Sequence, residues 1–236
     1  MTAAEGEPEQ VPAAAGDVFG DRVELAERFV ARLREEGVRR GLIGPREAGR
    51  LWERHVLNSA IVAELLPAEC GVIDVGSGAG LPGIPLAIAR PDLHLTLLEP
   101  MARRVTWLQE VITELDLSVE VVRGRAEEVP VRTRLADHDV VTARAVAPME
   151  RLAKWCIPLL RPGGRLLAMK GESAAEELER DAAAIAAVGG DRGEVVSCGD
   201  GVLDVPTTVV VVERVAANAS ARRRDGGRRP RKDRGR

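Results

Sequence analysis

Seven short apolar segments after Pro67 constrain the fold of this chain more strongly than any other feature of its sequence. Each has four to six residues, rich in Val, Leu or Ile, and turn-forming residues bound it. Helical stretches lie between most of them, and strands that alternate with helices form βαβ units. The pattern predicts an α/β fold with a mostly parallel seven-stranded sheet that helices cover on both faces. The segments span residues 72–75, 95–99, 119–122, 139–143, 165–170, 194–198 and 207–212.

The regions around this sheet have other patterns. Apolar residues recur at helical spacing over residues 17–67, which predicts a helical extension before the sheet domain of residues 68–215. Residues 1–16 are acidic, and we expect them to be disordered. Residues 216–236 carry nine Lys or Arg against two Asp, with no apolar residue larger than Ala. We expect a disordered basic tail, which either attracts nucleic-acid phosphates or only aids solubility.

Composition argues against several classes of protein. The chain has no Tyr, and 2% of its residues are aromatic, too few for a surface that stacks on single-stranded bases. It lacks a run of about 18 apolar residues and a secretory leader pattern, so we expect a cytoplasmic protein without a membrane partner. Cys70, Cys156 and Cys198 fit neither a disulfide framework nor a CxxC site, and no two histidines have metal-ligand spacing. We therefore expect reduced, buried cysteines and no metal.

A glycine-rich turn, DVGSGAGLPGIP at residues 74–85, follows the first strand segment and precedes a helical stretch. This context is typical of an anion or nucleotide site in which backbone N–H groups face the ligand. No Gly-Lys-Ser or Gly-Lys-Thr follows, so the turn is not a Walker A motif. A dinucleotide fingerprint that begins at Gly76 and Gly78 needs a third Gly at the position of Leu81. A nicotinamide dehydrogenase is therefore the weaker alternative.

Two prolines at the start of the next helix indicate which ligand the turn binds. N–H groups in a first helical turn have no partner within the helix, so Pro82 and Pro85 remove donors that the helix does not use. Fewer N–H groups also make a weaker cradle for pyrophosphate. The turn favours a nucleoside without phosphates, such as S-adenosylmethionine. Asp74 and Glu99 end the first two strands, and Glu99 can accept both ribose hydroxyls; alternatively, each carboxylate caps a helix or accepts backbone N–H groups.

Five motifs follow one another along the chain: ERHVLNS at 53–59, the glycine-rich turn, EVVRGRAEEVP at 120–130, TARAVAP at 142–148 and MKG at 169–171. Together they resemble the small-subunit ribosomal RNA guanine-N7 methyltransferases, also known as the glucose-inhibited division protein B family. The resemblance covers roughly residues 17–213. In the loop before the first motif, many members have Asn-Leu-Thr where this chain has Gly41-Leu42-Ile43.

The resemblance implies a class I S-adenosylmethionine-dependent methyltransferase with a Rossmann-like sheet domain. It implies methyl transfer from S-adenosylmethionine to N7 of one guanine in 16S ribosomal RNA, position 527 in the standard RNA numbering. N7 has a lone pair and no proton, so the reaction requires alignment and charge screening but no general base. We expect a monomer whose partner is 16S ribosomal RNA or the small ribosomal subunit, and not DNA.

The resemblance also assigns roles to cofactor-binding residues. The glycines and the residue after them shape the pocket for the methionine and ribose parts, and two residues after the third strand contact the adenine edge. A single exposed glutamate after a strand would not suggest this role without the resemblance. The implied set is Asp74, Gly76, Gly78, Gly80, Leu81, Glu99, Ala126, Glu127 and Arg144.

Arg144 is the strongest candidate for a role in catalysis. It ends the fourth strand, and the carboxyl edge of a parallel sheet is where ligands bind. An Arg among Ala and Val is costly there unless it meets an anion. The resemblance implies that Arg144 contacts the cofactor and borders the guanine pocket, where it orients the substrate. The alternative is a buried ion pair with Glu127 or Asp74.

Other basic residues are candidates for holding RNA. Lys170 ends the fifth strand and could hold an RNA phosphate, and the basic residues of 222–236 could do the same. Arg54 belongs to an Arg-His pair that the chain shares with the family it resembles. Lys170 is alternatively an exposed charge, and His55, which follows Arg54, is more often a structural residue than a catalyst.

Two other functions remain open. One is a methyltransferase of the same fold that acts on a small molecule or protein, and the other is an RNA-binding assembly factor without catalysis.

Overall fold

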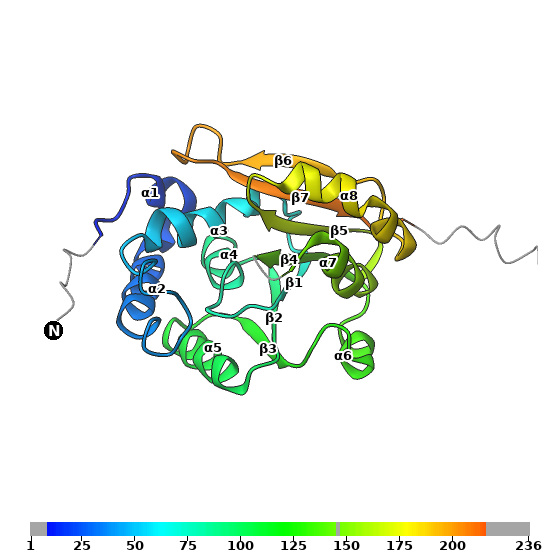
Figure 1. Ribbon diagram of the computed structural model, residues 1–236. Coiled ribbons are helices and arrows are strands. Elements are labelled where there is room, and N and C mark those ends of the chain that lie inside the picture. Colours follow the sequence, from blue (N-terminus) through cyan, green and yellow to red (C-terminus); the bar gives the residue numbers. More distant parts are fainter. Residues whose placement is uncertain (1–8, 145–146, 216–236) are drawn as a thin grey trace, which may run out of the picture.

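The computed structural model describes residues 9–144 and 147–215 of the protein (Figure 1). Within these residues seven strands form one sheet in the order β3-β2-β1-β4-β5-β7-β6. β1 to β5 pair in parallel, and β7 is antiparallel to both of its neighbours, β5 and β6. Each predicted segment lies within one strand, so the prediction of a mostly parallel seven-stranded sheet is confirmed. The strands are β1 (Gly71–Val75), β2 (His94–Glu99), β3 (Val119–Arg123), β4 (His138–Arg144), β5 (Leu160–Lys170), β6 (Glu194–Cys198) and β7 (Thr207–Glu213).

The two faces of the sheet pack into two apolar clusters. Along β1, Val72 belongs to one cluster and Ile73 to the other, because side chains of a strand alternate between its faces. Both residues are fully buried, as is typical of a parallel strand between two helix layers. The first face is covered by α4 (Gly83–Ala89) and α5 (Ala102–Glu114), and the second by α6 (Val129–Arg134), α7 (Met149–Cys156) and α8 (Ala174–Ala187).

The N-terminal helical extension packs on the first face, beside α4 and α5 (Figure 1). Its elements are α1 (Ala14–Phe19), η1 (Gly20–Arg22), α2 (Val23–Glu36), η2 (Trp52–Leu57), α3 (Asn58–Ala60) and η3 (Ile61–Leu65). Phe29, Leu33 and Trp52 are fully buried in the same cluster as side chains of α4 and α5. The extension and the sheet therefore share one apolar core. η2, which carries most of the ERHVLNS motif, is a π-helical turn, a feature that is frequent at functional sites.

The structure differs from the prediction of disorder at residues 9–16. α1 begins at Ala14 rather than after this segment. The Glu9 carboxylate accepts the backbone N–H groups of Leu51 (2.7 Å) and Trp52 (3.1 Å), and so caps the start of the helical segment that contains η2. The prediction is wrong here because the contact joins residues about forty positions apart, which a local pattern does not reveal.

Three further findings do not concern the sheet. No helix within residues 9–144 and 147–215 is long and apolar enough to cross a membrane. The predicted basic tail of residues 216–236 lies outside the described residues, as do residues 1–8. The three cysteines are free and buried, as the sequence predicts.

Candidate functional site

The glycine-rich turn connects β1 to α4 with a backbone that only glycine adopts easily. The φ angles of Gly76, Gly78 and Gly80 are +77°, +57° and +97°, all in the left-handed region. At Gly80 there is also no space for a side chain, because a Cβ would lie 2.5 Å from Cγ1 of Ile84. These three positions therefore require glycine for the tight turn after β1.

The N–H groups in the first turn of α4 already donate to acceptors within the protein. The Gly83 N–H donates to Oδ2 of Asp74 (3.1 Å), and the Ile84 N–H donates to the Gly80 carbonyl oxygen (2.7 Å). Pro85 has no N–H to offer. None of these three residues retains a free donor for a pyrophosphate, which agrees with the role predicted for the prolines.

Asp74 lies at the end of β1 and is fully buried. Its Oδ2 accepts the Gly83 N–H, but its Oδ1 has no hydrogen-bond partner among the described residues. Burial, which is only partly offset by hydrogen bonds, raises the pKa of this carboxyl to about 7. A buried carboxylate oxygen without a partner fits a cationic ligand, because a positive charge would supply the missing interaction.

Glu99 ends β2 and is also buried. Its Oε2 accepts the Gly78 N–H (2.9 Å), its Oε1 accepts the Met101 N–H (2.9 Å), and Nη1 of Arg104 lies 3.9 Å from Oε2. Both carboxylate oxygens therefore accept backbone N–H groups, as the alternative to a ribose contact predicted. Each oxygen retains a second lone pair, so these bonds do not prevent Glu99 from accepting ribose hydroxyls.

Arg144 ends β4, and its guanidinium reaches the N-terminal extension. Nη1 donates to the His55 carbonyl oxygen (3.0 Å) and to Oγ of Ser59 (2.7 Å). Nη2 donates to the Arg54 carbonyl oxygen (3.1 Å) and to Nδ1 of His55 (2.6 Å). Burial lowers the pKa of Arg144 to about 10, and the charge of Asp74 opposes this shift. Hydrogen-bonded ion pairs of Arg144 with Glu127 or Asp74, the predicted alternative, are not found among the described residues.

The carboxyl ends of the first four strands bring most of the predicted cofactor residues together. The Glu99 carboxylate accepts the Gly78 N–H of the turn. The backbone carbonyl oxygen of Glu99 accepts the Gly124 N–H (3.3 Å) at the end of β3. Ala126 follows and is buried, whereas Glu127 is exposed. These bonds bring the turn and the end of β3 to the same edge of the sheet.

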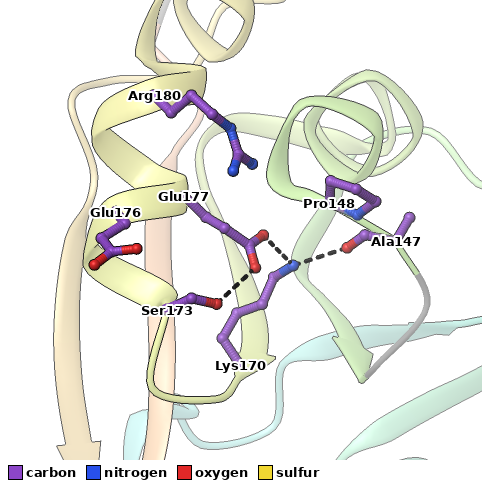
Figure 2. Close-up of a pocket in the computed structure, with 7 residues that line it drawn as sticks. All are labelled: Ala147, Pro148, Lys170, Ser173, Glu176, Glu177 and Arg180. Carbon is purple, nitrogen blue, oxygen red and sulfur yellow. Dashed lines mark hydrogen bonds and ion pairs between the residues drawn. The ribbon is translucent and has the colours of Figure 1, made fainter.

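Lys170 lies apart from this group, at the end of β5 (Figure 2). Its Nζ donates to Oε2 of Glu177 (2.8 Å) and to the Ala147 carbonyl oxygen (2.8 Å), and 9% of its side chain is exposed. It is therefore not the exposed charge of the predicted alternative, and binding an RNA phosphate would require its ion pair to open. The surrounding pocket, of about 370 Å³, is lined by Ala147, Pro148, Lys170, Ser173, Glu176, Glu177 and Arg180.

Sequence reasoning missed the partners of Arg144. His55 and Ser59 lie one helical turn apart in the ERHVLNS motif, and this spacing places two polar side chains on one helix face. Both polar side chains are buried, and they lie among the buried apolar residues of η2 and α3. The spacing was therefore a usable signal. Arg54, a predicted RNA contact, is exposed, and its Nε lies 3.2 Å from Oε2 of Glu47.

Metal-ligating side chains do not cluster in this site. Among residues 9–144 and 147–215, no three His, Cys, Asp or Glu side chains form a group that could hold a metal ion.

We expect Gly80→Ala to destabilise the protein by about 1–3 kcal/mol and to weaken cofactor binding, because the new Cβ meets Ile84 and φ is positive. Urea denaturation and cofactor titration measure both effects. Gly16→Ala is the control, because that position lies in a helix and has open space around it. Equal stabilities of the two variants would contradict the role given to Gly80.

Comparisons with known proteins match this chain along most of its length. A family model described as rRNA small subunit methyltransferase G matches residues 22–205. The ribosomal RNA small subunit methyltransferase G of Rhodococcus jostii is 57% identical over 212 residues, which cover 89% of this chain and 93% of that protein. The protein of the same name from Salinispora tropica is 55% identical over 232 residues, with 94% and 96% covered.

A solved structure shows a related fold at low sequence identity. It is a SAM-dependent O-methyltransferase from Thermotoga maritima, with a TM-score of 0.50 and 18% identity, covering 68% of this chain and 65% of that chain. At this identity the similarity concerns the fold alone. It agrees with the predicted Rossmann-like architecture of the sheet domain.

Proposed function

Because the chain belongs to the rRNA small subunit methyltransferase G family, we propose that it transfers the methyl group of S-adenosylmethionine to N7 of a guanine in 16S ribosomal RNA. The protein is an enzyme with a class I methyltransferase fold, and S-adenosylmethionine is its cofactor. One observation supports the proposal most directly. The carboxyl ends of three strands bring Asp74, Glu99 and Arg144 around a turn whose first helical N–H groups are already bonded.

The residues at this edge of the sheet fit S-adenosylmethionine. The cofactor carries positive charge and no phosphate, and the unpartnered Oδ1 of Asp74 and the bonded first turn of α4 match both properties. We assign the ribose hydroxyls to Glu99 and the adenine edge to Ala126 and Glu127. When bound, the cofactor supplies an electrophilic methyl group on a positively charged sulfur.

The chemistry requires little from the protein beyond placement and charge. As the bond from N7 to the methyl carbon forms, the bond from that carbon to sulfur breaks, and the positive charge moves from sulfur to the base. No proton leaves the guanine, so no general base is needed. We propose that Asp74 stabilises the positive charge through its carboxylate and that Arg144 fixes the border of the guanine site.

We propose that the target is guanine 527 of 16S ribosomal RNA, the position that the family resemblance implies. We propose that Arg54, Lys170 and the basic residues of 222–236 hold the phosphates of this RNA, and that the enzyme acts as a cytoplasmic monomer. Binding through Arg and Lys releases counterions, so the affinity for RNA should fall steeply as salt rises.

Transfer of labelled methyl groups to isolated RNA distinguishes this proposal from its alternatives. Small subunits and stripped 16S RNA, both from cells that lack the modification, are incubated with labelled S-adenosylmethionine. We expect label in RNA that ribonuclease releases. Label in a protein or small molecule instead would support a methyltransferase of the same fold that acts on such a substrate. RNA binding without label would support an assembly factor.

We expect the affinity for S-adenosylmethionine to rise about tenfold per pH unit up to pH 7 and to level off above it. The pKa of Asp74 is raised to about 7, so below that pH the carboxyl is neutral and must lose a proton to pair with a cation. Calorimetry in buffers with different ionisation enthalpies measures the released proton. In Asp74→Asn the affinity should be weaker and the proton release lost. A proton release equal to that of the unchanged protein would contradict this role of Asp74.

A further inference from the structure

A chain of hydrogen bonds connects the loop before η2 to the end of β4. Oε2 of Glu47 lies 2.8 Å from Nε2 of His55, and Nδ1 of His55 lies 2.6 Å from Nη2 of Arg144. Glu47 lies in the segment between α2 and η2, close to the positions where this chain departs from the usual Asn-Leu-Thr of the family. The imidazole of His55 therefore stands between a carboxylate and the guanidinium that ends β4.

The donors and acceptors in this chain determine the protonation of His55. A guanidinium nitrogen only donates hydrogen bonds, so Nδ1 of His55 must accept from Arg144 and carries no proton. Nε2 then carries the ring proton and donates it to the Glu47 carboxylate. The geometry thus requires the neutral Nε2–H tautomer. A second proton on Nδ1 would point at the Arg144 guanidinium and remove one of its acceptors.

Arg144 depends strongly on this acceptor. Its two terminal nitrogens have four N–H groups, and all four point to acceptors in the extension, two on backbone carbonyls and two on the side chains of Ser59 and His55. Within the described residues, these bonds leave only the Nε–H of Arg144 for another partner. Of the four acceptors, Nδ1 of His55 is the one whose ability to accept ends when it gains a proton.

Charged groups around His55 come from three elements. Arg144 faces it from β4, Glu47 from the loop before η2, and Arg54 from η2 itself. Asp74 of β1 faces Arg144 rather than the imidazole. Burial and the charge of Arg144 lower the pKa of His55, and Glu47 opposes this shift. The neutral form that the hydrogen bonds require is therefore also the form that the surroundings favour.

We infer that His55, oriented by Glu47, is a positioning residue that holds Arg144 in place for methyl transfer, and that a proton on Nδ1 of His55 releases Arg144 and slows the reaction. This inference rests on the proposed function, since it concerns the rate of that reaction. The tautomer of His55 and its hydrogen bond to Arg144, in contrast, do not depend on the substrate.

Three variants of His55 separate positioning from folding. The side-chain oxygen of Asn can lie where Nδ1 lies and cannot be protonated, that of Gln lies nearer to the position of Nε2, and Ala offers no acceptor. We expect His55→Asn to keep most of the methyl transfer rate, and His55→Gln and His55→Ala to lose about tenfold or more at saturating cofactor. We also expect the decline in rate at acidic pH, measured at saturating cofactor so that Asp74 stays ionised, to disappear in His55→Asn. Equal rates in the Asn and Ala variants, with an unchanged pH profile, would overturn the inference.

The loop residue has a matched control. Glu47→Ala should lower the rate at saturating cofactor, whereas Glu53→Ala should not, because Glu53 is an exposed carboxylate of η2 with no hydrogen bond or ion pair among the described residues. Equal rates in the two variants would contradict the role of Glu47. Thermal unfolding of each variant shows whether a loss of rate reflects a loss of folded protein.

Nitrogen NMR tests the geometry without any methyl transfer. The chain has three histidines, so the ring signals of His55 are identified by their loss in His55→Asn. At neutral pH we expect the neutral Nε2–H tautomer, and in Arg144→Gln we expect the pKa of His55 to rise because the guanidinium charge is gone. A protonated Nδ1, or no change in that variant, would overturn the inference. If the unchanged enzyme shows this signature but labels no RNA, the proposed function fails and the hydrogen-bond chain stands.

Discussion

Arg144→Lys should lower methyl transfer at saturating cofactor by roughly 100-fold or more while the protein stays folded. The guanidinium of Arg144 reaches four acceptors from two nitrogens, and a single lysine ammonium cannot span them. The substituted side chain would therefore leave buried acceptors without partners and would no longer border the guanine site at a fixed position. Steady-state rates with small subunits or stripped 16S RNA, and thermal unfolding of the variant, measure the two parts of this prediction.

A matched substitution at the other end of the sheet controls for the change of side chain. Arg161 lies near the start of β5, is half exposed, and pairs with Asp139 (2.7 Å) at the opposite edge from the site. We expect Arg161→Lys to leave the rate unchanged. If Arg144→Lys and Arg161→Lys have the same rate, Arg144 has no special part in the reaction.

Trp107→Ala should lower the free energy of unfolding by about 3–5 kcal/mol. Trp107 of α5 is fully buried, and its Nε1–H donates to the Ala79 carbonyl oxygen (3.0 Å) in the glycine-rich turn. The guanidinium carbons of Arg32 and Arg40 lie 5.7 and 5.3 Å from the centre of its ring. The substitution thus opens a cavity, leaves the Ala79 carbonyl without its partner, and removes the ring between the extension and the turn. Urea denaturation measures the loss.

Trp155→Ala is the comparison. Trp155 is only partly buried, and Arg151 lies 5.7 Å from its ring centre. Like Trp107, it therefore has a cation–π contact, but among the residues that the structure describes it has no buried hydrogen bond to the glycine-rich turn. We expect a loss of about 1–2 kcal/mol there, with unchanged affinity for S-adenosylmethionine. Trp107→Phe should fall between the two, because it fills most of the cavity but leaves the Ala79 carbonyl unpaired. Equal losses of unfolding free energy in Trp107→Ala and Trp155→Ala would contradict the contribution given to the buried Trp107 ring and its hydrogen bond to Ala79.

The sheet was predictable because its signal is local. Each strand appears as a short apolar run, and the glycines and prolines after β1 identify the turn through their own backbone requirements. The assignment of Asp74 and Glu99 to the site followed from their place at strand ends. The local pattern does not show which of their oxygens accept N–H groups and which have no partner. The donors lie up to twenty-one positions away, as Gly78 does from Glu99.

The partners of charged side chains were the least predictable feature. Arg144 was expected to meet an anion, yet its acceptors lie 85 to 90 positions earlier in the chain and are mostly uncharged. Lys170 was interpreted as an RNA contact or an exposed charge, yet the first turns of α8 bring Glu177 against it. In both places, the packing of a helix against the end of a strand decides the partner, and that packing is set by the whole fold.

Chain scission specific for N7-methylguanine tests the central claim most directly. Small subunits from cells that lack the modification are methylated with labelled S-adenosylmethionine, and their RNA is reduced and cleaved with aniline. We expect one new cleavage, at guanine 527 of 16S RNA, that is absent with Arg144→Lys. Labelled RNA that does not cleave, or cleavage at many guanines, would contradict a site built to present one guanine N7 to the methyl group.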